Sequence, residues 1–410
     1  MSKSNLKIKL GQIGKVSMCK RIMKHQTSLN GDVPFYKISS FGDQTDTYIS
    51  KEIYNEFKEK YSFPKKGDVL ISAAGTLGKT AIYDGEPAYF QDSNIVWIDN
   101  DESIVLNSYL YYFYQTKPWV TTSGSTINRI YNDNLRNLNL SIPPLPTQRS
   151  IAKVLSDLDA KIELNNKINE ELEAMAKTLY DYWFVQFDFP TPPSSTSGIV
   201  GKPYKSSGGK MVYNAELKRE IPEGWEVKEL GDCIKIFDHK RIPLSSKERE
   251  TYKGIIPYYG ATGILDYVND FIFNDDLILL AEDGSVMDEN GFPIVQFIWG
   301  KTWVNNHAHV IQANKKTQNE FYFQLLKRIP VILIKTGSIQ MKINQKNLCN
   351  YKILTPSEDL IDKFSEVSRT IRKSLINITE QNQQLSSLRD WLLPMLMNGQ
   401  VASRASATAE

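Results

Sequence analysis

The stretch from Thr147 to Trp183 restricts the fold of this chain more than any other, because it contains neither proline nor glycine. Its apolar residues step by four and three, the a/d spacing of a heptad repeat, which predicts one long helix that pairs with another helix. At 1.5 Å per residue, about 37 residues form a rod of roughly 55 Å. The seam consists of Ile151, Leu155, Leu158, Ile162, Asn165, Asn169, Leu172, Ala176, Leu179 and Trp183.

A second copy of this helix is predicted from Ser357 to Leu393. The segments that precede the two helices also match, since Gly124 and Gly337, like Leu135 and Leu348, are 213 positions apart. The chain is therefore predicted to be a tandem repeat of a globular unit followed by a long helix. The second seam consists of Phe364, Ile371, Leu375, Ile378, Asn382, Leu385 and Leu392.

The repeat predicts an α+β protein in which two mixed, mostly β domains alternate with two helices that pair as an antiparallel coiled coil about a pseudo-two-fold axis. The connector between the repeats is rich in Pro, Ser and Gly and is predicted to be exposed, and the small polar tail to be disordered. The predicted boundaries are 1–145 and 213–356 for the domains, 146–187 and 357–394 for the helices, 188–212 for the connector and 395–410 for the tail.

The amino-acid composition limits the partners, the cysteine chemistry and the compartment that are expected for the protein. Lys and Arg number 49 against 47 Asp and Glu, a balance that neither requires nor excludes nucleic acid. The three cysteines, Cys19, Cys233 and Cys349, form no CxxC pair, so neither a disulfide nor a zinc site is expected. No apolar run is long enough to span a membrane. We therefore expect a cytoplasmic protein with no membrane partner.

Two motifs resemble catalytic or metal sites without matching them. The stretch from Ala73 to Thr80 lacks the first glycine of a phosphate-binding P-loop and precedes strand-like sequence, so a plain β-turn is predicted. His307 and His309 share one face of a predicted strand, but no third ligand is evident, and packing or a base contact is favoured over a metal. The sequence also lacks methyltransferase and cofactor motifs, so no catalytic residue, metal site or cofactor is predicted in this chain.

A glycine followed by hydroxyl and amide side chains precedes Arg129 in one repeat and Lys342 in the other. Such residues suit phosphate oxygens and guanine edges. An ordinary surface turn with a solvated cation is the alternative, but the recurrence of the cation favours DNA binding. A Lys-Arg pair after a Leu-Gly is a weaker match. The candidate DNA-binding residues are Lys20, Arg21, Gly124, Ser125, Thr126, Arg129, Lys240, Arg241, Gly337, Ser338, Gln340 and Lys342.

The first helix also carries apolar residues beyond its seam, spaced seven or fourteen positions apart. Two paired helices need only a narrow apolar stripe, so the wider band predicts docking of further helices from partner subunits. Packing against the helix's own globular domain is the alternative. Asparagines inside the seams are expected to fix the register of pairing. The candidate docking residues are Val154, Ile168, Met175 and Tyr182.

With these residues in view, the chain resembles the specificity subunit of type I restriction–modification systems. The resemblance rests on the helix IPPLPTQRSIAKVLSDLDAKIELNNKINEELEAMAKTLYDYWF, the connector GKPYKSSGGKMVYNAELKREIPEGWEVKELGD and the ending LRDWLLPMLMNGQV. It implies two target recognition domains, each reading half of a bipartite, asymmetric sequence in double-stranded DNA. It also implies that the paired helices are a spacer and dock two methyltransferase subunits, to which restriction subunits add.

The resemblance further implies that S-adenosylmethionine, ATP and Mg belong to the partner subunits, and that this chain is non-catalytic by itself. Two other classes of protein remain. A fused methyltransferase–specificity enzyme requires a cofactor motif that this sequence lacks. A coiled-coil adaptor that binds proteins without reading DNA predicts no salt-sensitive affinity for DNA.

Overall fold

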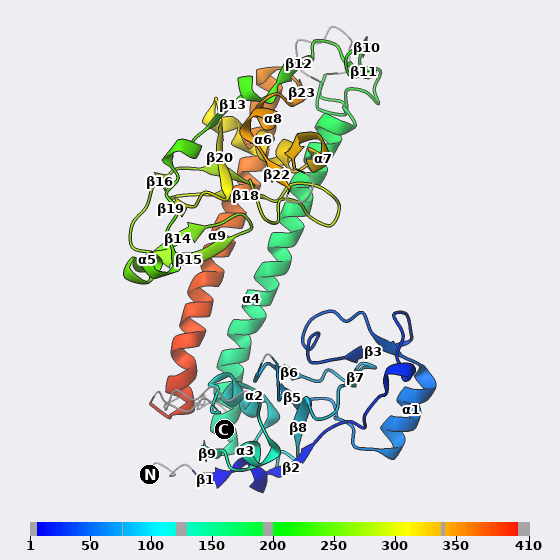
Figure 1. Ribbon diagram of the computed structural model, residues 1–410, viewed down its shortest axis with the longest axis vertical. Helices are drawn as coiled ribbons and strands as arrows, with labels where there is room; N and C mark the ends of the chain where they lie inside the picture. Colours follow the sequence, from blue (N-terminus) through cyan, green and yellow to red (C-terminus); the bar gives the residue numbers. More distant parts are fainter. Residues whose placement is uncertain (1–5, 76, 120–128, 192–199, 338–340, 401–410) are drawn as a thin grey trace, which may run out of the picture. The chain divides into compact units, whose positions relative to one another are not determined.

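The computed structural model divides the chain into two compact units, and the boundary between them passes through both long helices (Figure 1). The first unit contains residues 1–165 and 380–410, and the second contains residues 166–379. Each unit therefore combines one globular domain with one part of each helix. The structure describes residues 6–75, 77–119, 129–191, 200–337 and 341–400.

The two long helices are α4 (Leu145–Tyr180) and α9 (Glu358–Met397). Pro146 lies in the first turn of α4, where backbone N–H groups have no intrahelical partner and proline is tolerated. Helix α9 begins with two acidic residues, whose charge is favourable at a helix N-terminus. A turn of π-helix, η3 (Asp181–Val185), extends α4.

In the first unit, the helices pair through polar groups. The Nδ2 atom of Asn165 donates to Gln381 Oε1 at 2.7 Å and to Asn382 Oδ1 at 2.8 Å, and Arg389 Nη1 donates to Asp159 Oδ1 at 2.9 Å. Residue numbers fall along α9 as they rise along α4, so the pairing is antiparallel. Asn165 is only 1% exposed, and its bonds fix the register as the sequence predicts.

In the second unit, the same two helices are also antiparallel. Asn169 Nδ2 donates to Thr379 Oγ1 at 3.4 Å, and the rings of Trp183 and Phe364 have centroids 5.8 Å apart. The predicted α+β class with a coiled-coil pair of helices is therefore confirmed.

The first globular domain is built on a four-stranded antiparallel sheet in the order β2-β8-β5-β6. A second, three-stranded sheet has the order β4-β3-β7. The strands are β1 (Leu6–Lys9), β2 (Gly14–Ser17), β3 (Val33–Tyr36), β4 (Tyr48–Ile49), β5 (Val69–Ser72), β6 (Thr80–Ile82), β7 (Tyr89–Phe90), β8 (Ile95–Asn100) and β9 (Asn139–Ile142), and the helices are α1 (Lys51–Lys60), α2 (Asn107–Gln115) and α3 (Asn132–Arg136).

The second globular domain has the corresponding four-stranded sheet, in the order β13-β20-β17-β18, and a further sheet in the order β15-β14-β19-β16. Two-stranded ladders join β10 to β11, β12 to β23 and β21 to β22. The strands are β10 (Met211–Asn214), β11 (Arg219–Pro222), β12 (Glu226–Glu229), β13 (Ile234–Ile236), β14 (Lys253–Tyr259), β15 (Ile264–Val268), β16 (Phe273–Asn274), β17 (Leu277–Ala281), β18 (Val295–Ile298), β19 (Lys301–Val304), β20 (Ala308–Ala313), β21 (Lys335–Thr336), β22 (Lys342–Ile343) and β23 (Lys352–Thr355), and the helices are α5 (Ser246–Thr251), α6 (Asn319–Leu326), α7 (Val331–Ile334) and α8 (Gln345–Cys349).

The offset of 213 positions reappears in the secondary structure. Strand β8 and strand β20, helix α3 and helix α8, and strand β9 and strand β23 each have bounds that differ by that offset. The sheet registers agree as well. Gly14, the first residue of β2, pairs with Asn100, and Ile234, the first residue of β13, pairs with Ala313, which is the equivalent of Asn100. The internal repeat therefore holds at the level of individual residues.

Each domain is attached to both long helices within its own unit. In the first, Tyr112 of α2 donates its hydroxyl to Asp159 of α4 at 2.7 Å, and Asp159 also binds Arg389 of α9. In the second, the ring centroid of Phe184 from η3 lies 4.9 Å from that of Phe321 in α6 and 5.0 Å from that of Phe364 in α9. These buried rings fix the second domain on its helices.

Two segments differ from the sequence prediction. The start of the connector is packed, since Asp188, Phe189 and Thr191 are buried and Phe189 stacks on Tyr204 at 4.6 Å. Its composition is polar on average, but these few aromatic rings bury enough surface to order it. Residues 192–199 lie outside the described part of the chain.

The predicted tail also begins too early. Helix α9 continues to Met397, and Leu396 and Met397 are buried in the core of the first unit. Pro394 does not end the helix, although proline removes one backbone hydrogen bond there. Among the residues that the structure describes, no helix has the length and apolarity needed to cross a membrane.

Candidate nucleic-acid interface and docking surface

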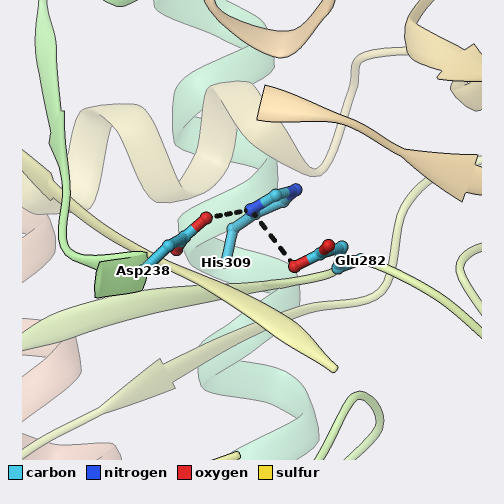
Figure 2. A group of neighbouring side chains, drawn as sticks. All are labelled: Asp238, Glu282 and His309. Atoms are coloured by element: carbon cyan, nitrogen blue, oxygen red, sulfur yellow. Dashed lines mark hydrogen bonds and ion pairs between the residues drawn. The ribbon is translucent and has the colours of Figure 1, made fainter. Parts of the chain in front are cut away.

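Three side chains that are far apart in the sequence meet in the second domain: Asp238 in η5 (Asp238–Lys240), Glu282 directly after β17, and His309 in β20 (Figure 2). His309 Nδ1 lies 2.5 Å from Asp238 Oδ2, and His309 Nε2 lies 2.7 Å from the carbonyl oxygen of Ile343. Both ring nitrogens face acceptors, and only the doubly protonated imidazolium carries a hydrogen on each. With Asp238 ionised, both contacts are satisfied only when His309 is a cation.

The electrostatic surroundings favour the same state. Burial by itself lowers the pKa of His309, but the hydrogen bond and charge of Asp238 outweigh it, with help from the Ile343 carbonyl and Glu282, so the pKa of His309 lies above its ordinary value of 6.5. For Asp238, burial raises the pKa, and the hydrogen bond and charge of His309 outweigh this and lower it below the usual value.

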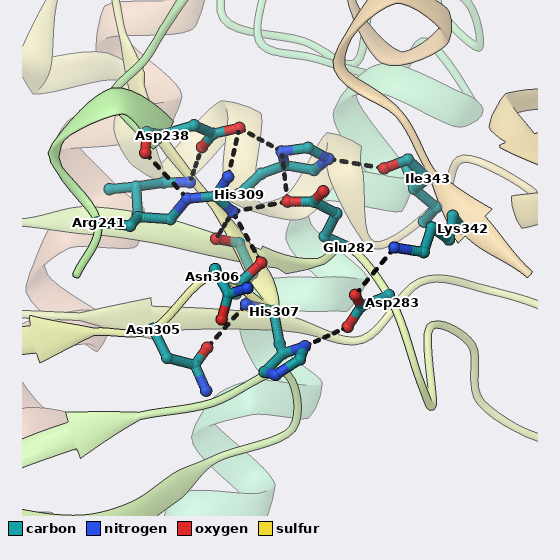
Figure 3. A network of polar contacts seen from close by, with 12 residues as sticks. Asp238, Arg241, Glu282, Asp283, Asn305, Asn306, His307, His309, Lys342 and Ile343 are labelled. Atoms are coloured by element: carbon teal, nitrogen blue, oxygen red, sulfur yellow. Dashed lines mark hydrogen bonds and ion pairs between the residues drawn. The ribbon is translucent and has the colours of Figure 1, made fainter. Parts of the chain in front are cut away.

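Arg241 completes this group (Figure 3). Its Nη1 atom lies 2.6 Å from Glu282 Oε2 and donates to the carbonyl oxygens of Ala308 at 2.8 Å and Asn306 at 3.3 Å. Its side chain is 13% exposed. We call Asp238, Arg241, Glu282 and His309 the His309 network; its two cations balance its two anions. Arg241, a predicted DNA-binding residue, is held inside the domain instead of projecting from its surface.

The residue types of the His309 network raise the question of a metal site, because ligand atoms of Asp238, Glu282 and His309 lie within 4.8 Å of one another. Two contacts argue against one. The guanidinium of Arg241 already binds Glu282, and both nitrogens of His309 carry hydrogens directed at oxygen, whereas a metal requires a nitrogen lone pair. An internal ion network is the better description.

Asp283, the residue after Glu282, makes a second set of contacts nearer the surface. Asp283 Oδ1 lies 2.5 Å from His307 Nδ1, and Asp283 Oδ2 lies 3.2 Å from Lys342 Nζ (Figure 3). Burial raises the pKa of Asp283, but the hydrogen bonds from His307 and Lys342 outweigh it, and its pKa is lowered. Both His307 and Lys342 have half-exposed side chains, so Asp283 positions two donors at the surface.

In the first domain, Arg129 occupies the place of Lys342. Ile130 donates its backbone N–H to the Ala73 carbonyl at 2.8 Å, and Ile343 likewise donates to the Glu282 carbonyl at 2.9 Å. The cation that precedes each isoleucine is therefore at an equivalent position in the two sheets. This confirms the structural match that the sequence predicts for Arg129 and Lys342; contact with DNA stays a prediction.

Two candidate cations of the first domain contact one turn before β8. Arg129 Nη2 donates to the Ser93 carbonyl at 3.0 Å, and Arg21 Nε donates to Asp92 Oδ2 at 2.9 Å. Asn306, whose carbonyl accepts from Arg241, is the equivalent of Ser93. This turn and its acidic residue Asp92 are not predicted from the sequence, although the 213-residue offset marks Ser93 and Asn306 as a matched pair.

Two of the remaining candidate DNA-binding residues lie over aromatic rings. Lys20 lies over the ring of Tyr61 at 5.1 Å, and Lys240 lies over Phe237 at 5.0 Å. Gly337 is exposed and has a φ of +79°, a conformation that favours glycine. The predicted residues Gly124, Ser125, Thr126, Ser338 and Gln340 lie outside the described part of the chain.

The P-loop-like stretch forms a β-hairpin. Strand β5 leads through Gly78, whose N–H donates to the Ser72 carbonyl at 2.9 Å, into strand β6. A phosphate-binding loop of this type leads into a helix instead. The prediction of a plain turn is therefore confirmed.

The predicted docking band is exposed on α4 and η3. Val154 in the first unit is 40% exposed, and Ile168, Met175 and Tyr182 in the second unit are 37%, 57% and 37% exposed. Each of these side chains keeps more than a third of its surface accessible, which leaves it available to a partner. Large apolar side chains that remain exposed at regular spacing along a helix are typical of a protein–protein contact.

Comparisons with known proteins agree with this architecture. Residues 3–174 and 222–380 each match the family described as the type I restriction modification DNA specificity domain. A putative type I restriction enzyme specificity subunit of Haemophilus influenzae is 53% identical over 182 residues, which are 44% of this chain and 46% of that protein. The MjaIX specificity subunit of Methanocaldococcus jannaschii is 27% identical over 404 residues, 90% of this chain and 87% of that protein.

A solved structure shows the same fold. The S subunit of a type I restriction-modification system from M. genitalium superposes with a TM-score of 0.59 at 16% sequence identity, covering 97% of each chain. Two specificity-domain matches, two repeated α+β domains and two long paired helices therefore agree, and the chain belongs to the family of type I restriction–modification specificity subunits.

Proposed function

We propose that this chain reads a bipartite, asymmetric target in double-stranded DNA, and that each globular domain reads one half-site. The observation that carries the proposal is the equivalence of Arg129 and Lys342, two cations at matched places in two domains of a DNA-specificity family. Their surroundings differ, since Arg129 binds a backbone carbonyl and Lys342 a carboxylate. Different surroundings favour different half-sites.

The proposal extends to the partners. Two methyltransferase subunits dock on the exposed band of α4 and η3, and restriction subunits join them. These subunits supply the catalytic residues, together with S-adenosylmethionine, ATP and Mg, while this chain supplies the sequence specificity. The support is the family membership and the exposed apolar residues of the band. A coiled-coil adaptor remains the alternative, and it predicts no preference for any DNA sequence.

Replacing Arg129 or Lys342 with alanine is expected to weaken specific DNA binding by about 1–3 kcal/mol, the usual contribution of a cation that reads a base edge. Arg129→Ala should relax only one half-site and Lys342→Ala only the other. The guanidinium of Arg129 and the ammonium of Lys342 each have donors beyond the single bond described above. Sequencing of methylated genomic DNA from a host that carries the variant and its partner subunits measures both half-sites.

Lys153→Ala is the matched control, because Lys153 is an exposed cation on α4 that pairs with Asp157. It should leave the methylated sequence unchanged. Unchanged affinity and unchanged half-sites in both the Arg129 and the Lys342 variants would remove these cations from the interface.

Ile168→Asp or Met175→Asp is expected to prevent assembly with the methyltransferase subunits, because docking would bury an unpaired charge at a cost of several kcal/mol. Light scattering of the co-expressed complex measures assembly. Ser156→Asp adds the same charge to the same helix outside the band and should assemble normally. A complex of normal mass from the Ile168 and Met175 variants would show that the band is not the docking surface.

A further inference from the structure

The His309 network holds strand β22 from one side. His309 Nε2 donates to the Ile343 carbonyl, and the Ile343 N–H donates to the Glu282 carbonyl. Strand β22 consists of Lys342 and Ile343, and its ladder among the described residues is the two-residue pairing with β21. A ladder this short depends on such external bonds. His309 is therefore one of the groups that hold the strand carrying Lys342.

The charged and titratable groups around His309 come from several elements. Asp238 and Arg241 lie in and after η5, Glu282 follows β17, and the thiol of Cys349 in α8 interacts with Asp238. Asp283, His307 and Lys342 form the outer layer of contacts. Arg241 compensates one of the two inner carboxylates, so the other remains unbalanced when the imidazolium loses its proton.

Neutral imidazole cannot satisfy both neighbours of His309. One ring nitrogen then presents a lone pair, either to the Asp238 carboxylate or to the Ile343 carbonyl. This lone pair and the oxygen that it faces repel each other, and the His309 side chain is only 2% exposed, so water cannot relieve the contact. Keeping the bond to the charged carboxylate is preferred, since hydrogen bonds to charged groups are the stronger ones. The bond to β22 is then the one that is lost.

The described residues of the first domain include no counterpart of the His309 network. The sheet registers place Val96 at the position of His309, Ala73 at that of Glu282 and Met18 at that of Asp238. Both Ala73 and Val96 are apolar and buried. The first domain is therefore an internal control for the second.

We propose that His309, as an imidazolium, is the positioning residue that holds β22 and Lys342 in place for DNA reading, so that only the half-site read by the second domain becomes sensitive to pH. The inference rests on the proposed function and adds a regulation to it. The pKa of His309 in the folded protein lies above its ordinary value of 6.5. The hydrogen bond from His309 to β22 is therefore fully present below pH 6.5 and is lost as the pH rises through the raised pKa.

The test uses the full chain in complex with its methyltransferase subunits and duplexes of the sequence found methylated in the host. Competition binding between pH 6 and pH 9 measures how strongly a single wrong base pair in each half-site weakens the complex. For the second half-site, this discrimination should fall roughly tenfold as the pH rises, the effect of losing a hydrogen bond from a charged donor. For the first half-site, it should stay constant.

His309→Gln should show the low discrimination at the second half-site at every pH, and His239→Gln, at an exposed histidine beside Asp238, should behave as the wild type. The chain has four histidines, so a ¹³C-histidine NMR titration of the wild-type protein measures the pKa of His309 without any variant that has to fold. A pKa at or below 6.5, or discrimination that is independent of pH at both half-sites, overturns the role of His309. Absence of any sequence preference at pH 6 overturns the proposed function itself.

Discussion

Arg372→Met is expected to lower the free energy of unfolding of the second unit by about 3–5 kcal/mol, because it leaves a buried carboxylate without its partner. Arg372 Nε and Nη2 lie 3.0 and 3.3 Å from the two carboxylate oxygens of Glu320, whose side chain is 4% exposed. The guanidinium also packs on Phe297 and Phe323, with its carbon 4.3 and 4.6 Å from the ring centroids. The pair joins α9 to α6 within this unit.

The loss in the free energy of unfolding of Arg372→Met should depend on pH. Burial raises the pKa of Glu320 and the charge of Arg372 opposes that shift. Removing the arginine raises the pKa further, so the carboxyl group of the variant takes up a proton more readily on folding. A group with a raised folded pKa stabilises the folded state in its protonated form. The loss of stability should therefore be largest at neutral pH and smaller near pH 5.

Native-state hydrogen exchange of α6 measures the effect within the second unit. Two control variants separate the buried charge from the lost packing. Arg372→Met with Glu320→Leu replaces the whole pair by apolar side chains and should recover most of the loss. Arg389→Met breaks a pair on the same helix whose partners are each 33% exposed, and should cost about 1 kcal/mol or less. Equal protection in wild type and Arg372→Met would show that the pair contributes nothing.

Periodicity and repetition made the scaffold predictable from the sequence. Heptad spacing needs only local information, and the 213-residue offset aligned α3 and β9 with α8 and β23 without further evidence from contacts. The equivalence of Arg129 and Lys342 followed for the same reason. Such patterns predict position, but they carry no information about which side chains become buried.

The His309 network shows where prediction failed. Arg21 and Arg241 follow the same sequence signature, yet Arg21 is 65% exposed at the side chain and Arg241 only 13%. The difference arises from Glu282 and His309, which replace Ala73 and Val96 in the second sheet. His309 is equivalent to Val96 in the sheet register, and a shift of one residue in a strand moves a side chain to the other face, so its place in the network follows only from the exact register. Non-local contacts of this kind require the structure.

Inserting one heptad into each long helix is expected to abolish methylation of the natural target and to favour a target with a longer spacer. Insertion after Asn165 and after Thr379 follows the boundary between the units and keeps both polar pairs, Asn165 with Asn382 and Asn169 with Thr379. Each helix gains roughly 10 Å, which corresponds to about three base-pair steps of DNA. Three extra pairs also rotate the far half-site by roughly 100°, given 10 to 10.5 base pairs per turn.

An insertion in α4 alone is the matched control. It shifts one helix against the other, breaks the polar pairs on one side of the insertion and should impair folding or assembly instead of shifting the spacer. The paired insertion keeps the a/d pattern of both seams and should assemble with the partner subunits at normal mass. Any loss of activity at the natural target then reflects the distance and rotation between half-sites.

A library of targets with graded spacers, scored by methylation with the assembled paired-insertion variant, is the most direct test that two domains read two half-sites whose separation the helices set. We expect both half-site sequences to stay the same and the preferred spacer to lengthen by about three base pairs, with lower activity where the rotation is not compensated. An assembled variant that keeps the original spacer optimum would contradict the account.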